Sequence, residues 1–417
     1  MKSDLKSKIK TIASDSILSI IALVLMNVVA QFIVYPFWKR AYGSDFYGHI
    51  LYAMSIVNIF GITVGNAANN ARMVASVKGK TEDGDYSIFV LTGSVISALG
   101  TLPLILFGGL DMDLTTAVLT GVLTFVTCWR YYCDVEFRLN INYKGYFLYY
   151  VIISIGYALG IALMQVIPYW PVALIPGELA GLIFVRVKGK VISGFRDKRS
   201  PDFTSILGTI FLLSVTYFIN NLVFNGDRLL LEHTLGGDFV TIYYLGSLVG
   251  KTMTLITSPM NSVIIGYLAR YHGQFTKKMV TWLLGVTFGT IVLFSGLSVL
   301  GSYILIQLLY PESFEQALPF FLIGNAAQIF YFVANVVTTV LLRMAKANYQ
   351  LKINIVYAVT FLACCIPATI FGGLWGFCFA ILFVNIVRYL MAIILCYTHT
   401  GSRALGASSV AETEQKG

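Results

Sequence analysis

Long apolar runs recur from one end of this chain to the other and constrain its fold more than any other feature. Most have about 17–25 residues, the length that an α-helix needs to cross the hydrocarbon core of a bilayer. Hydrophobic residues make up 57% of the 417 residues and charged residues only 12%, about half the charged share of soluble domains. An outer-membrane barrel would instead show alternating strands of about 10 residues. The sequence therefore predicts an all-α polytopic membrane protein.

The runs predict about twelve transmembrane helices. The boundaries between the fifth and sixth helices and between the eleventh and twelfth are the least distinct. The approximate spans are 12–35, 47–70, 86–109, 114–133, 146–167, 170–187, 203–225, 239–266, 280–308, 317–342, 352–371 and 373–397.

The net charge of +9 is distributed unevenly along the chain. If the N-terminus is cytoplasmic, 24 of the 29 basic residues lie in cytoplasmic segments, and only Lys39, Arg40 and Arg228 lie in outer loops. The remaining two, Lys251 and Arg388, lie within apolar runs. Basic residues concentrate on the cytoplasmic side of membrane proteins. The charge therefore predicts cytoplasmic N- and C-termini and an even number of helices, and no nucleic-acid partner.

A short loop occurs twice. The stretch "AYGSDFYG" at 41–48 returns as "TLGGDFVT" at 234–241, each following one predicted helix and preceding the next. Either the chain is a parallel duplication about a pseudo-two-fold axis along the membrane normal, or glycine and aspartate simply begin both helices well. The matching positions favour duplication into two six-helix bundles. The predicted parts are a cytoplasmic N-terminus (1–11), a first bundle (12–190), a cytoplasmic linker (191–202), a second bundle (203–399) and a disordered cytoplasmic tail (400–417).

Three ionisable residues lie near the predicted membrane midplane. At 1.5 Å per residue, Lys251 lies roughly 18 Å from the outer boundary, Glu178 about 14 Å and Arg388 about 21 Å. Such residues are costly in a bilayer and face a protein interior or a wet cavity. Lys251 and Arg388 are predicted to attract an anionic substrate, with Glu178 as a coupling or counter-charge residue. The alternatives are interhelical ion pairs and cations held by backbone carbonyl groups.

Two arginines lie toward the predicted cytoplasmic ends of helices. Arg130, Asp134 and Arg138 have i, i+4 spacing and predict an ion-pair ladder on one helix face. The alternative for Arg130 is contact with a lipid headgroup or, as a cavity cation, with the substrate. Arg72 is either a positive-inside anchor or a contact for an entering substrate.

Further candidates lie at helix ends and kinks. Asp227 and Arg228 lie at the outer end of the predicted seventh helix, where an outer loop from about Gly226 to Asp238 begins. A surface ion pair or a helix-end charge is the simple explanation for them, and a coupling or counter-charge role is the alternative. Positions predicted to act as hinges or kinks are Pro36, Pro259 and Gly266.

No signature of catalysis or metal binding appears. The four histidines are far apart, the six cysteines form no CxxC pair, and no phosphate-binding glycine loop occurs. The sequence predicts no catalytic residue, no metal site, no cofactor and no enzymatic activity.

The segment "QFIVYPFWKRAYGSDFYGHILYAMSI" resembles the start of bacterial polysaccharide flippases, the Wzx-type family of the multidrug/oligosaccharidyl-lipid/polysaccharide (MOP) exporters. The segment "GDRLLLEHTLGGDFVTIYYLGSLVGKTMTLITSPM" is similar to the second half of that family, with Gly266 where a second proline is common. The residues that carry the resemblance are Tyr35, Pro36, Arg40, Gly43, Phe46, Gly48, Asp227, Arg228, Gly236, Tyr243 and Pro259.

This resemblance implies a flippase of the bacterial cytoplasmic (inner) membrane that moves undecaprenyl-diphosphate-linked oligosaccharide to the outer leaflet by alternating access. The product would serve O-antigen (lipopolysaccharide) or capsule biosynthesis. Implied partners are that substrate, membrane lipids and other polysaccharide-assembly membrane proteins. Coupling to a proton or sodium gradient stays open. The alternatives are a cation-coupled drug or small-molecule exporter of the same superfamily, a membrane-embedded polysaccharide polymerase or ligase, and a non-transporting scaffold.

Overall fold

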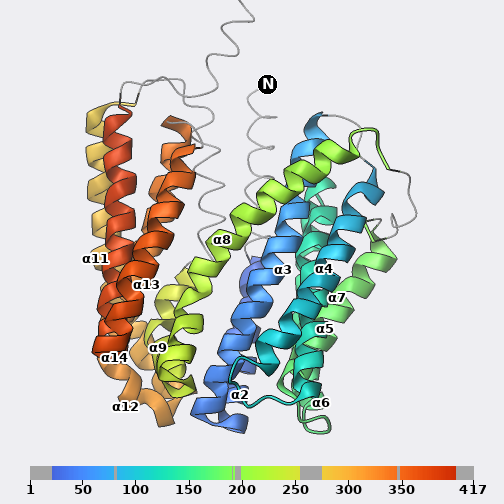
Figure 1. Ribbon diagram of the computed structural model, residues 1–417, viewed down its shortest axis with the longest axis horizontal. Coiled ribbons are helices and arrows are strands. Elements are labelled where there is room, and N and C mark those ends of the chain that lie inside the picture. The colour runs from blue at the N-terminus through green and yellow to red at the C-terminus, as the bar shows by residue number, and fades with distance from the viewer. Residues whose placement is uncertain are drawn as a thin grey trace, which may run out of the picture. The chain divides into compact units, whose positions relative to one another are not determined.

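The computed structural model describes residues 21–78, 82–189, 191–192, 199–253, 275–344 and 348–400, which are helical almost throughout (Figure 1). No strand occurs in these ranges. A helix satisfies its own backbone hydrogen bonds inside hydrocarbon, which is why apolar runs of this length adopt it. The predicted all-α membrane fold is confirmed.

The helical elements follow one another with short connections. In chain order they are the π-helical turn η1 (Ala30–Val34), α2 (Tyr35–Tyr42), α3 (Ser44–Lys78), α4 (Asp83–Leu106), α5 (Leu114–Leu139), α6 (Tyr143–Leu163), η2 (Trp170–Ala173), α7 (Ile175–Lys188), α8 (Phe203–Leu235), α9 (Gly237–Met253), α11 (Lys277–Leu309), η5 (Pro311–Ser313), α12 (Phe314–Ala317), η6 (Leu318–Phe320), α13 (Phe321–Met344) and α14 (Asn348–Thr398).

Eight segments of the described chain are long and apolar enough to cross a membrane. The last of them lies within α14, which is really two helices, because Gly373 interrupts it with φ 57° and ψ −146°. A positive φ of this size favours glycine. Dividing α14 there and adding α5, α7 and α9 gives twelve helical segments in the described ranges, and the break falls beside the predicted division at 371–373.

The chain forms two compact units, residues 1–240 and 241–417. In the first unit α3 packs against α4, α5 and α8, and α7 packs against α5 and α6 (Figure 1). In the second unit α13 packs against α11 and α14. The sequence instead places the division between halves in the linker 191–202. That division rests on the repeated loop rather than on packing, and it stays a prediction. The predicted N-terminal segment 1–11, residues 193–198 of the predicted linker and the tail beyond Thr400 lie outside the described residues.

The two copies of the repeated loop have the same backbone shape. Gly43 separates α2 from α3 with φ 82° and ψ 179°, and Gly236 separates α8 from α9 with φ 93° and ψ 174°. Both therefore make the same left-handed break between consecutive helices, as the sequence predicts. The copies also touch, because a Cβ added to Gly237 would lie 2.2 Å from the backbone oxygen of Asp45.

The predicted outer loop from Gly226 to Asp238 is wrong. Helix α8 continues as far as Leu235, and its last three turns bury Asp227, Arg228 and Leu231. The apolar run in the sequence ends near residue 225. The helix nevertheless continues, because its polar residues pack against the neighbouring helix α3.

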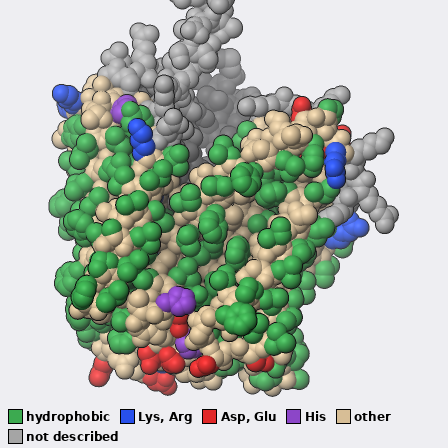
Figure 2. Space-filling model, in the orientation of Figure 1, with side chains coloured by type: hydrophobic (Ala, Val, Ile, Leu, Met, Phe, Trp, Pro, Cys, Tyr) green, Lys and Arg blue, Asp and Glu red, His purple; other side chains and the backbone are tan. Residues whose placement is uncertain are grey.

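Many large apolar side chains remain exposed on the helices. In Figure 2 hydrophobic side chains cover the sides of the helices on the visible face, whereas charged side chains gather at helix ends. Phe211, Leu212 and Trp282 are among the exposed residues. Such a surface suits contact with lipid rather than water.

Candidate functional site

Arg388 lies in the second half of α14 and is buried against two other helical segments. Its guanidinium carbon is 4.5 Å from the ring centre of Tyr331 on α13 and 4.6 Å from that of Tyr357 in the first half of α14. Its Nη2 donates to Oδ1 of Asn335 at 2.8 Å. Two aromatic faces and one amide oxygen therefore hold this cation.

The charge of Arg388 has no carboxylate partner among the residues that the structure describes. Its Nε and Nη1 are buried and have no hydrogen-bond acceptor there. Burying a charge without acceptors is costly, so a group that supplied them would be stabilised. Chemically, this arrangement can donate two hydrogen bonds to an anion such as a phosphate.

Helix α13 presents a row of neutral polar side chains that sequence reasoning did not single out. Asn325 Oδ1 accepts from the backbone N–H of Gly250 at 2.6 Å, and its Nδ2 donates to Ser302 Oγ at 2.8 Å. Gln328 Nε2 donates to the hydroxyl of Tyr243 at 3.1 Å. With Asn335, these residues form a polar face on a mostly apolar helix, and their recurrence within one apolar run is the signal that could have revealed it.

Lys251 lies in the last described turn of α9 and is half-buried. The predicted helix at 239–266 continues into residues 254–274, which lie outside the described part of the chain. Its role as a cavity cation stays a prediction.

Arg130 and Glu178 form an ion pair inside the first unit. Arg130 Nε on α5 lies 3.0 Å from Oε1 and 2.9 Å from Oε2 of Glu178 on α7. The hydroxyl of Tyr157 on α6 donates to Oε1 at 2.6 Å, and both charged residues are buried. Glu178 is thus the counter-charge of Arg130, as the interhelical alternative anticipated. Its role in coupling stays a prediction.

The predicted ladder Arg130–Asp134–Arg138 is only half formed. Arg138 Nη2 lies 3.8 Å from Asp134 Oδ2, but Arg130 pairs with α7 instead. Asp134 accepts hydrogen bonds from the hydroxyls of Tyr150 and Tyr146 on α6. The sequence spacing does not reveal this outcome, because it contains no information on which helix packs beside Arg130.

Arg72 forms an ion pair with Asp83 at the first turn of α4 and donates to the hydroxyl of Tyr132 at 2.8 Å. This pairing is what an anchor between α3 and α4 requires, and contact with substrate stays a prediction.

Asp227 and Arg228 are not surface residues, contrary to the prediction, because α8 continues past them and buries both. Arg228 Nη1 lies 3.4 Å from Ser55 Oγ on α3, and the backbone N–H of Arg228 donates to Asp227 Oδ1.

Of the predicted hinges, only Pro36 lies within the described ranges. It occupies the first turn of α2, directly after the π-helical turn η1. A π turn beside a proline is a common place for a helix to bend. Pro259 and Gly266 lie outside the described residues, and all three hinge roles stay predictions.

Within the described residues, no three His, Cys, Asp or Glu side chains are placed to hold a metal ion. The charges described above instead suit a bound anion in the second unit, whereas Arg130 and Arg72 of the first unit each have a carboxylate partner.

Comparison with known proteins gives matches to structures only. No family model and no curated protein matches the sequence. A crystal structure of MATE in the bent conformation matches with a TM-score of 0.62 and 14% identity, over 97% of each chain. The inward-facing conformation of a multidrug resistance MATE family transporter of the MOP superfamily matches with a TM-score of 0.62 and 12% identity, covering 90% of this chain and 97% of that one.

A third match is a MOP superfamily transporter from Pyrococcus furiosus, with a TM-score of 0.62 and 13% identity, covering 92% of this chain and 95% of that one. All three matches extend over nearly the full chain. The protein therefore has the fold of the MATE transporters of the MOP superfamily.

Proposed function

We propose that this protein is a membrane transporter that flips a lipid-diphosphate-linked oligosaccharide from the inner to the outer leaflet of the bacterial cytoplasmic membrane. The observation that carries the proposal is Arg388, a buried cation with two unsatisfied donors and no carboxylate partner in the described chain. A diphosphate crossing hydrocarbon needs such a cation in a sheltered path. The undecaprenyl chain of the substrate would stay in the lipid.

The charge pattern separates this proposal from its nearest rival. Arg130 and Arg72 are each compensated by a carboxylate, whereas Arg388 is not. An exporter of cationic drugs would instead need an uncompensated acidic residue. The Pyrococcus furiosus relative is described as having a binding pocket of reverse polarity that suggests a different function. A binding pocket of unusual polarity has thus been described for a structural neighbour of this chain, and the proposal needs such a pocket.

The second candidate is a drug or small-molecule exporter, favoured by the neighbours described as multidrug resistance transporters. In that case a proton or sodium gradient would drive export, and Glu178 would be the residue that couples the ion to the substrate. A membrane-embedded polysaccharide polymerase or ligase is the third candidate.

The proposed setting is a multi-pass protein with both termini in the cytoplasm, where the basic residues concentrate. Its partners would be the lipid-linked oligosaccharide, membrane lipids and other polysaccharide-assembly proteins. The glycan would be an O-antigen or a capsule.

Gene deletion tests the proposal directly. We expect the deletion strain to lose a surface polysaccharide and to accumulate lipid-linked repeat units in the inner leaflet. Complementation with Arg388→Ala should restore little of that polysaccharide, and Arg388→Lys should restore part of it, because lysine keeps the charge but not the planar contact with two rings. The matched control is the exposed Arg186→Gln, which should complement fully.

Normal surface glycans in the deletion strain, combined with increased sensitivity to cationic drugs, would favour the exporter instead. Full complementation by Arg388→Ala at normal protein levels would show that Arg388 does not contribute to transport.

A further inference from the structure

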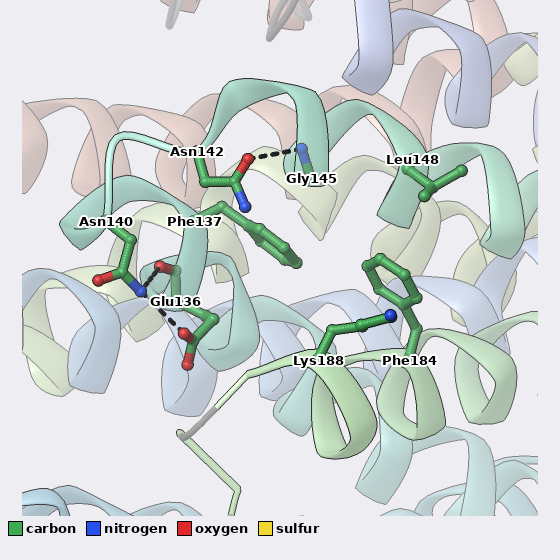
Figure 3. A pocket seen from close by; sticks show the side chains of 8 residues that line it. All are labelled: Glu136, Phe137, Asn140, Asn142, Gly145, Leu148, Phe184 and Lys188. Carbon is green, nitrogen blue, oxygen red and sulfur yellow. Dashed lines mark hydrogen bonds between the residues drawn. The ribbon is translucent and has the colours of Figure 1, made fainter.

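A pocket of about 250 Å³ lies where α5 ends, α6 begins and α7 ends (Figure 3). All of its lining residues belong to the first unit. Sites that enclose a whole drug-sized ligand usually measure about 300–1,000 Å³. This pocket can therefore enclose only part of a larger molecule.

The lining carries one negative and one positive side chain, Glu136 and Lys188. Glu136 accepts from Nδ2 of Asn140 at 2.8 Å through Oε1 and from the backbone N–H of Val191 at 2.9 Å through Oε2. A carboxylate has about four lone-pair sites, so Glu136 can serve as an acceptor alongside the contacts that it already makes. Lys188 has no carboxylate partner in the described part of the chain.

The remaining wall of the pocket is apolar. The rings of Phe137 and Phe184 stack with their centres 6.3 Å apart, and Leu148 lies beside them (Figure 3). Along α7, Ile183 and Val187 are 63% and 71% exposed. The pocket therefore lies next to an apolar helix surface of the kind that contacts acyl chains.

The loop between α5 and α6 is held in a strained shape at the rim. Ile141 has φ 50°, which is rare for a β-branched residue, and its side chain is 69% exposed. Asn142 Oδ1 accepts a hydrogen bond from the backbone N–H of Gly145 at 2.9 Å. Its amide nitrogen is thereby left as a donor at the pocket. Strain of this kind persists where surrounding contacts fix it, and it concentrates at ligand sites.

We propose that this pocket binds the headgroup of a phospholipid that carries both a phosphate and a primary ammonium. The phosphate is held by Lys188 and the amide of Asn142, and the ammonium donates to Glu136. The acyl chains follow Leu148 and the exposed face of α7 outward. A purely anionic headgroup would satisfy Lys188 but bring a second negative charge beside Glu136, which is unfavourable. This proposal is independent of the transported substrate.

The position within the chain supports a lipid as the occupant. Arg138 in the last turn of α5 and Lys144 in the first turn of α6 lie at this end of the helices, which the sequence predicts to be cytoplasmic. Basic residues at a helix end lie at the level of the lipid headgroups, and lysine extends its amino group toward that layer.

Lipid binding to the full-length protein purified in detergent tests the proposal. The readouts are bound-lipid mass spectrometry and the shift in melting temperature. The lipids compared are phosphatidylethanolamine, phosphatidylcholine, whose quaternary ammonium has no N–H, and phosphatidylglycerol, which has no ammonium. Inorganic phosphate serves as the free-anion arm. We expect phosphatidylethanolamine to bind most tightly and inorganic phosphate to have no effect.

Two matched pairs of variants locate the site. Lys188→Gln should weaken phosphatidylethanolamine binding about tenfold, the loss expected for one charged hydrogen bond, whereas Arg186→Gln on the same helix turn should not. Phe184→Ala should weaken it as well, whereas Leu99→Ala at an exposed apolar position on α4, away from the pocket, should not. Equal effects within both pairs, or equal binding of all three lipids, would overturn the proposal.

Discussion

His49 Nδ1 lies 2.6 Å from Oε1 of Glu232, so a buried contact joins the start of α3 to the end of α8. A second contact lies beside it, between the hydroxyl of Tyr52 and Nε2 of His233 at 3.2 Å. These residues come from opposite halves of the proposed duplication. The contacts therefore hold the two copies of the repeated loop against each other.

Removing Glu232 should destabilise the first unit. We expect Glu232→Ala to lower the free energy of unfolding by about 2–3 kcal/mol, because a hydrogen bond to a charged group is lost and His49 stays buried. Thermal unfolding of the protein in detergent measures this as a lower melting temperature. The exposed Glu315→Ala is the control and should change nothing. An unchanged melting temperature for Glu232→Ala would show that the α3–α8 contact contributes no stability.

The close approach of the two loops predicts that glycine is needed at position 48. A Cβ at Gly48 would lie 2.0 Å from the backbone oxygen of Gly237, so neither backbone can avoid the clash without moving. Gly48→Ala should cost about 1–3 kcal/mol of stability. Gly208→Ala in α8 is the matched control, because a Cβ there meets nothing within 4 Å. It should leave the melting temperature unchanged or raise it slightly. Equal behaviour of the two variants would contradict the close contact.

The buried pair of Arg130 and Glu178 predicts strong non-additivity. Arg130→Met alone leaves an uncompensated carboxylate in the interior and should cost about 3–5 kcal/mol. The double variant Arg130→Met/Glu178→Leu should recover most of that loss, because an apolar pair of similar volume needs no counter-charge. A double-mutant cycle on unfolding in detergent gives the coupling energy. Additive losses would mean that the two residues do not interact in the folded protein.

The break in α14 and the repeated loop could be predicted because their signals are local. Gly372 and Gly373 interrupt an apolar run, and Gly43 and Gly236 each separate two such runs. Glycine is the residue that adopts positive φ without strain, so these positions mark helix ends in the sequence itself.

The partners of the charged residues could not be predicted, because they depend on how helices rotate against one another. Asp134 is four residues from Arg130, yet Arg130 pairs with Glu178, 48 positions away. Asn335 carries no charge and gives no signal of its own, although it is the hydrogen-bond partner of Arg388. The apolar run also predicts that α8 ends about ten residues too early, near residue 225. Asp227 and Arg228 are polar residues that tertiary packing buries, so the helix continues through them.

The N-cap of α5 predicts a dependence of stability on pH. Asp113 accepts hydrogen bonds from the hydroxyl of Thr116 and from its backbone N–H at 3.0 Å. These bonds, the hydroxyl first, hold the pKa of Asp113 below the ordinary value of 3.8. Because the folded-state pKa is the lower one, the contribution of the cap is complete above that ordinary value. The stability that the cap contributes is lost as the pH falls through the pKa of Asp113 in the folded state.

Asp113→Ala should therefore lower stability by about 1 kcal/mol at neutral pH, the usual cost of losing a cap. Asp113→Asn should keep most of the cap but lose its part of the pH dependence below about pH 4. The matched control is Asp202→Ala, because Asp202 is the N-cap of α8 and its side chain makes no capping hydrogen bond. Melting temperatures measured between neutral pH and about pH 3 compare the three variants with the parent protein. A larger loss for Asp202→Ala than for Asp113→Ala would contradict the assigned cap, because only the side chain of Asp113 meets the first turn of its helix.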